Sequence, residues 1–141
     1  MKERHSVMLA GAIVMFFSLI GLATARAQMP MGGKLPPLKI ISPANGATVS
    51  GLVAVIFETP ADLSKMTMSM QMSEKEPHLH LDLDKRVMMP AMKQLTQVGK
   101  NRYRFSFGGA VPGRHTIRVY WADAKQHKPM GMVRSVTITV K

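Results

Sequence analysis

The chain contains no cysteine among its 141 residues. Disulfide bonds, thiolate nucleophiles, zinc-thiolate sites and dithiol redox pairs are therefore excluded. Many small exported proteins depend on disulfides, so an exported form of this chain must be stabilised by its hydrophobic core alone. Imidazole, carboxylate and thioether groups remain as side chains that can bind a metal ion.

The motifs of the common enzyme classes are also missing. There is no G-x-S-x-G, no H-E-x-x-H and no glycine-rich phosphate-binding loop. Serine, histidine and aspartate occur, but no spacing pairs them for catalysis. Asp82 and Asp84 could act as acid and base, but we interpret them as strand-surface carboxylates or as partners of nearby histidines. We expect a protein that is not an enzyme.

Acidic residues are scarce, with eight against 19 lysines and arginines, which gives a formal net charge of +11. A basic exported protein is attracted to anionic surfaces and to acidic partners in the cell envelope. The basic residues are scattered along the chain, which is also typical of a solvated surface. An exported protein is not expected to meet nucleic acid.

The N-terminus has the pattern of a secretory signal peptide. Lys2, Arg4 and His5 form a basic region, residues 8–22 are apolar apart from glycine and serine, and Ala25-Arg26-Ala27 has the small-x-small form of a cleavage site. We predict a helical signal peptide over 1–27 that is cleaved after Ala27. The apolar run is short for a membrane span, so no stable span should remain. The expected location is the periplasm or the extracellular medium.

The rest of the chain consists of short apolar or alternating runs separated by turn residues. The candidate strands are 38–41, 52–57, 65–72, 78–84, 94–98, 102–107, 115–121 and 132–140, of which 94–98 is the weakest. No segment outside the signal peptide has a convincing helical pattern. The sequence predicts an all-β, immunoglobulin-like antiparallel β-sandwich of about seven strands over 38–141, preceded by a flexible arm over 28–37.

One stretch, 65–84, contains two alternations of metal-binding side chains. In the first alternation, methionine occupies every second position, at Met66, Met68, Met70 and Met72. In the second, histidine and then aspartate occupy every second position, at His78, His80, Asp82 and Asp84. Successive strand residues point to opposite faces, so each set shares a face. The methionines can be core residues or soft ligands, and both interpretations stay open. His78 and His80 would lie about 6–7 Å apart, close enough to chelate one metal ion, or would face solvent.

Two further histidines could join this pair. His115 begins a predicted strand and His127 follows its far end, so a straight strand would keep them apart. A site built from His78, His80 and His115 is therefore easier to form than one that uses all four histidines.

Loop methionines provide a second kind of ligand. Met88, Met89 and Met92 lie in a proline-containing segment, and Met130 and Met132 lie near the C-terminus. A thioether binds copper(I) and keeps its ligand character in an oxidising compartment. These methionines could form a copper(I) surface.

Two segments resemble CopC-like periplasmic copper-resistance domains. Residues 41–49, ISPANGATV, resemble their opening strand and turn, and the part from Pro112 to the closing SVTITVK resembles their closing hairpin. The resemblance implies an immunoglobulin-like fold and copper handling. Those proteins bind copper(II) through an N-terminal histidine and an Asp-x-His. Here the predicted N-terminus is Gln28, and Asp123 lies four residues before His127.

A second resemblance covers more of the chain. His78-Leu79-His80, Pro112-Gly113-Arg114-His115 and His127 match small exported bacterial domains with an H-x-H…Pro-Gly-x-His…His pattern. This resemblance implies a fold but no reaction.

These observations lead to two functional hypotheses. The first is an exported protein that binds or handles copper through His78, His80, His115 and His127, with Met88, Met89 and Met92 as soft ligands. The alternative is a basic, non-catalytic interaction module that binds an acidic partner in the cell envelope and uses methionine only in its core.

Overall fold

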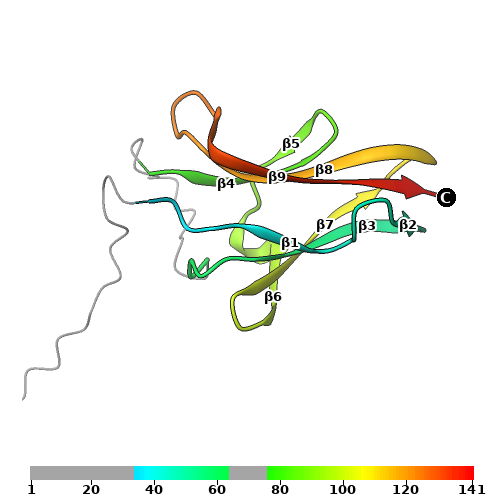
Figure 1. The fold of residues 1–141 in the computed structure, drawn as a ribbon, viewed down its shortest axis with the longest axis horizontal. Coiled ribbons are helices and arrows are strands. Elements are labelled where there is room, and N and C mark those ends of the chain that lie inside the picture. Colours follow the sequence, from blue (N-terminus) through cyan, green and yellow to red (C-terminus); the bar gives the residue numbers. More distant parts are fainter. Residues whose placement is uncertain (1–33, 64–75) are drawn as a thin grey trace, which may run out of the picture.

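A computed structural model describes residues 34–63 and 76–141 (Figure 1). The predicted signal peptide, most of the predicted arm and the methionine alternation at 66–72 lie outside the described residues. Within them, no helix is long and apolar enough to cross a membrane.

The described part is all-β, as the sequence predicts. Its strands are β1 (Lys39–Ser42), β2 (Thr48–Val49), β3 (Leu52–Glu58), β4 (His78–Leu83), β5 (Arg86–Met88), β6 (Leu95–Gly99), β7 (Arg102–Gly109), β8 (Gly113–Ala122) and β9 (Pro129–Val140), with one turn of 3₁₀ helix, η1 (Met92–Gln94), before β6. The two strands that the sequence did not indicate, β2 and β5, are only two and three residues long. Their pattern is too short to stand out, and β5 lies where a loop was expected.

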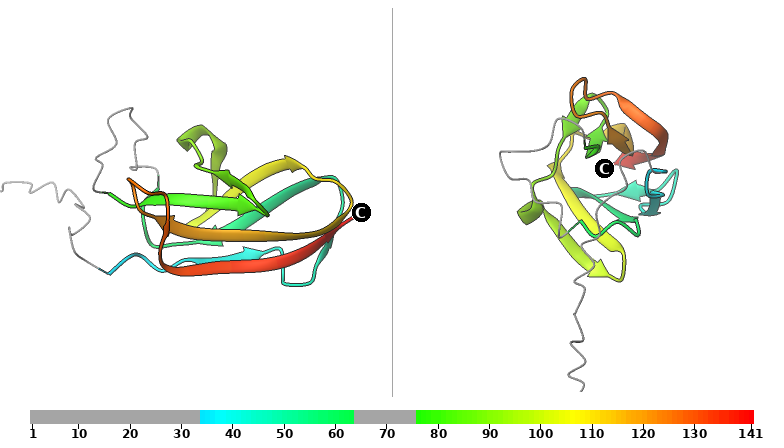
Figure 2. Two further views of the ribbon diagram at one scale, coloured as in Figure 1. Left: turned by 90° about the horizontal axis from the view of Figure 1, so that it is seen from above. Right: turned by 90° about the vertical axis from the view of Figure 1, so that its left-hand side faces the viewer.

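The strands form two sheets that lie face to face (Figures 1 and 2). One sheet has the order β1-β3-β7-β6 and the other has the order β2-β9-β8-β4-β5. Neighbouring strands are antiparallel except β2 and β9, which are parallel. The predicted antiparallel arrangement therefore holds for every pair in the described residues but this one.

Alternating residues of both sheets fill the space between them. One sheet supplies Val53, Val55, Phe57, Tyr103, Phe105 and Phe107, and the other supplies Leu79, Leu81, Leu83, Ile117, Val119, Trp121, Ile138 and Val140. The predicted inner face of Tyr103, Phe105 and Phe107 is confirmed. This period-two burial is what a sheet with one face on the core requires.

The N-terminal segment packs against the domain before β1 begins. Leu35 contacts the core, and the carbonyl oxygen of Pro36 accepts a hydrogen bond of 2.8 Å from Trp121 Nε1. The segment expected to be a flexible arm is thus attached to the domain over its last residues.

The predicted turn at Asn45–Gly46 is present. Gly46 has a φ of +83°, a conformation that glycine adopts without steric cost. Asn45 Oδ1 accepts a hydrogen bond of 2.8 Å from the Thr137 N–H, which ties this turn to β9.

Candidate metal centre

Strand β4 is buried on both of its faces. Its leucines face the core, so His78, His80 and Asp82 project from the opposite face. These three residues pair with Ala122, Tyr120 and Arg118 of β8. They are nonetheless 8%, 1% and 0% exposed. A buried polar row on the outer side of a sheet is unusual, because polar groups removed from water need partners.

Asp82 has such partners. Its Oδ2 accepts a hydrogen bond of 2.6 Å from Arg118 Nη2, and its Oδ1 accepts one of 3.2 Å from the Tyr120 hydroxyl. Burial and the neighbouring Asp82 carboxylate raise the pKa of Tyr120, so its hydroxyl stays protonated and remains a donor. The Asp82 carboxylate is therefore satisfied by two groups from β8.

His80 has none among the described residues. Neither its Nδ1 nor its Nε2 has a hydrogen-bond partner there, although both atoms are fully buried. Its ring lies between two others, with centroids 5.4 Å from Tyr120 and 5.6 Å from His127. A buried polar group that is left unsatisfied costs about 1–3 kcal/mol. Such a group calls for an explanation in its function.

His127 reaches this place from the loop between β8 and β9. The loop is closed by the backbone, since the Asp123 N–H bonds the Lys128 carbonyl at 2.8 Å and the His127 N–H bonds the Asp123 carbonyl at 2.9 Å. His127 is exposed and has a φ of +53°. Its ring centroid lies 6.2 Å from that of His78, so it neighbours both histidines of β4.

One of the two ring separations agrees with a shared ion, and the other is slightly too long. With metal–nitrogen bonds of about 2.0–2.1 Å, two imidazoles on one tetrahedral or trigonal ion have centroids roughly 5–6 Å apart. The centroid distances of His127 are 5.6 Å to His80 and 6.2 Å to His78. As they stand, however, no three His, Asp or Glu side chains of the described residues are placed to hold one metal ion. Binding would need the rings to turn, and the exposed ring of His127 has the space to do so.

The electrostatics favour the neutral form of the two strand histidines. Burial, followed by the proximity of His127, lowers the pKa of His78 and of His80. A neutral imidazole has a free lone pair, which is the form that binds a metal.

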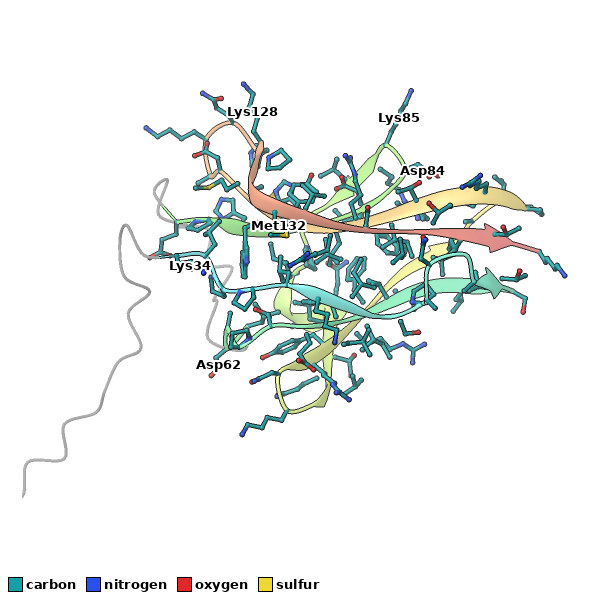
Figure 3. All side chains as sticks on the ribbon, in the orientation of Figure 1. Lys34, Asp62, Asp84, Lys85, Lys128 and Met132 are labelled. Carbon is teal, nitrogen blue, oxygen red and sulfur yellow. The ribbon has the colours of Figure 1, made fainter. Side chains whose placement is uncertain are left out.

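His115 lies elsewhere. Because β4 and β8 are antiparallel, the start of β8 lies beside the end of β4, far from His78. Figure 3 shows Asp84, at the end of β4, and Lys128, on the β8–β9 loop, at separate places along the sheet. The expected grouping of His78 and His80 with His115 is not the one that the structure forms. His127, in place of His115, lies beside His78 and His80.

Both ring nitrogens of His115 are already engaged. Its Nδ1 donates to Asp84 Oδ2 and its Nε2 donates to the Val111 carbonyl, each at 2.7 Å. Both partners are acceptors, so the ring must carry two protons. The bonds to Asp84 and Val111 raise the pKa of His115 accordingly. His115 therefore carries a positive charge and links the turn at Asp84 to the loop at Val111.

The other candidate methionine ligands lie on several elements. Met88 is half-buried and packs on the core opposite Leu81, while Met89 is 46% exposed. Met92 begins η1. Met130 and Met132 are exposed on β9, and Figure 3 labels Met132.

Comparisons with known proteins give no family. No family model matches the chain, and no curated protein matches it. Among solved structures, the endo-β-1,4-mannanase from Thermotoga petrophila is similar over 77% of this chain and 20% of its own, with 15% identity and a TM-score of 0.49. The twitchin kinase region from C. elegans is similar over 74% of this chain and 16% of its own, with 11% identity and a TM-score of 0.34. The chain thus spans a fifth or less of these proteins.

Proposed function

We propose that this chain is an exported copper-binding protein whose centre is formed by His78, His80 and His127. The observation that carries the proposal is His80, a buried imidazole with two ring nitrogens that bond no described residue. A metal ion bound to one of these nitrogens would offset part of the cost of burying the ring.

Copper fits this set of ligands. Imidazole nitrogen binds copper, zinc, nickel and iron, and among divalent ions of the first row copper has the highest affinity for a given site. The centre has no thiolate to favour zinc, because the chain has no cysteine. Exposed methionines such as Met89 offer soft donors on the same domain.

The proposal extends to the setting of this centre. The N-terminal pattern supports export to the periplasm or beyond, and two sheets around one core support the immunoglobulin-like sandwich. A rigid strand would then hold two ligands in fixed positions, while a loop supplies the third.

Titration of the purified exported protein with copper(II), and with copper(I) under a reductant, tests the proposal. We expect one copper per chain. A four-ligand structural site binds zinc with about 10–16 kcal/mol, so one ligand is worth roughly 3 kcal/mol, or about 100-fold in affinity. His80→Leu and His127→Asn should each weaken binding by that order, and asparagine tolerates the left-handed backbone at 127.

His115→Gln provides the matched control, since His115 lies outside the centre and should leave copper affinity unchanged. Binding no tighter than about millimolar, on the scale of weak non-specific association, would refute the proposal. If the histidine variants behave like the unsubstituted protein while salt weakens the association with an acidic envelope partner, the basic interaction module is the better description.

A further inference from the structure

The third ligand of the proposed centre depends on a loop. His80 and His78 are fixed by β4, whose register with β8 is continuous from His78 to Leu83. His127 has no such support, because it lies between β8 and β9 and is exposed. A contact within residues 123–128 must therefore hold the ring of His127 over β4.

The Asp123 side chain is the group that organises this loop. Its Oδ1 accepts hydrogen bonds from two successive backbone amides, that of Lys125 at 2.9 Å and that of Gln126 at 2.8 Å. The backbone of the same residue bonds Lys128 and His127. An aspartate that accepts from amides two and three residues ahead fixes a turn that the backbone would otherwise leave open.

The turn leads directly into the unusual conformation of His127. Left-handed backbone costs roughly 1–2 kcal/mol for a residue with a β-carbon, so His127 keeps it only while its surroundings require it. The requirement comes from the preceding amides, which the Asp123 carboxylate holds, and from the His127 N–H bond to the Asp123 carbonyl. These hydrogen bonds lower the pKa of Asp123, with that from Gln126 the largest contribution, so the carboxylate remains ionised well into the acid range.

We infer that Asp123 is a positioning residue that holds His127 over His80 and thereby completes the copper centre. This inference rests on the proposed function for its consequence in copper binding. The placement of His127 by Asp123 can be tested with no metal present.

Three variants test it. Asp123→Ala removes the acceptor, Asp123→Asn keeps an Oδ1 acceptor without the charge, and Asn45→Ala removes a comparable side-chain-to-backbone bond at the other end of β9. Loss of a group that orients a ligand typically weakens metal affinity by about 10- to 100-fold. We expect such a loss in Asp123→Ala, recovery in Asp123→Asn, and no change in Asn45→Ala.

A measurement on the metal-free protein makes the test independent of copper. Nuclear Overhauser contacts between the rings of His127 and His80 should be present in the unsubstituted protein and in Asp123→Asn, and lost in Asp123→Ala. Retention of these contacts in Asp123→Ala overturns the inference. So does an Asp123→Asn variant that binds copper as weakly as Asp123→Ala, because the carboxylate then acts as a ligand or as a charge. If the ring contacts change as expected but the unsubstituted protein binds no copper, the positioning role stands and the proposed function fails.

Discussion

Replacing His80 with leucine should stabilise the metal-free protein. The side chain is 1% exposed, and its two ring nitrogens bond none of the described residues. Leucine has a similar volume and no polar atoms, so it removes the unsatisfied groups without leaving a large cavity. A substitution of a buried histidine by a residue that cannot hydrogen-bond would normally destabilise a protein, which makes the predicted sign informative.

The magnitude follows from the two nitrogens. Each unsatisfied buried group costs about 1–3 kcal/mol, and removing both groups stabilises the fold by that cost. Part of this stabilisation is lost because leucine cannot make the ring contacts that His80 makes with Tyr120 and His127. We expect a net increase of about 1–3 kcal/mol in the free energy of unfolding. For a domain of about 100 residues each kcal/mol shifts Tm by about 4–8 °C, so the increase should be about 10 °C.

Urea unfolding in the presence of a chelator measures this change. The chain has one tryptophan, and Trp121 is 3% exposed, so its fluorescence reports on the loss of the core. His115→Leu is the matched control, because the same replacement there removes two hydrogen bonds and should cost about 1–3 kcal/mol. A His80→Leu protein that is less stable than the original by more than about 1 kcal/mol would refute the reasoning, since His80 would then have effective partners.

Two further predictions concern pH and the buried carboxylate. The pKa of His115 is raised, so the contribution of His115 to stability is complete below about pH 6.5 and is lost as the pH rises through the folded pKa. The pKa of His80 is lowered, so the contribution of His80 is complete above about pH 6.5 and declines as the pH falls through the folded pKa. The stability differences of His115→Gln and His80→Leu from the original, measured without metal between about pH 5 and 8, should therefore change in opposite directions, and parallel profiles would contradict both assignments. Arg118→Met should lower the free energy of unfolding by about 2–3 kcal/mol. This is less than the loss expected for breaking a fully buried ion pair, because the Arg118 side chain is 41% exposed while that of Asp82 is 0% exposed. Arg102→Met, which breaks the exposed pair with Glu58, should change stability by less than about 1 kcal/mol in the same urea assay, and equal effects of the two substitutions would show that burial of Asp82 is not what matters.

The strands were predictable because their burial follows a period of two. The runs at 52–57, 102–107 and 115–121 appear in the structure as β3, β7 and β8, and every second residue of each run lies in the core. The alternation at 78–84 also predicted correctly that His78 and His80 share a face. Their burial was not predictable, because the pattern of one strand does not show what covers its outer side.

The membership of the histidine cluster depends on topology. The sequence spacing predicts that His115 and His127 lie apart, and the structure places them at opposite ends of β8. Which of the two approaches β4 is decided by the antiparallel pairing of β4 and β8 and by the direction of the loop after Ala122. Asp123, two residues before Lys125 and three before Gln126, was a local signal for a side-chain-fixed turn, and it could have indicated that His127 has a defined position.

The cost of an unsatisfied imidazole would also explain why the proposed copper centre has two ligands on a strand and one on a loop. A centre whose three imidazoles were all buried and unsatisfied would lower the stability of a domain that has no disulfide to compensate. In this fold His80 is buried and bonds none of the described residues, whereas His127 is exposed and can bond water when no metal is present. The loop ligand then exchanges water for the ion at little cost in stability, and removal of copper should leave β4 unchanged while residues 123–128 become more mobile. Hydrogen exchange of the loop amides, compared with those of β4, distinguishes this arrangement from one in which the whole sheet loosens.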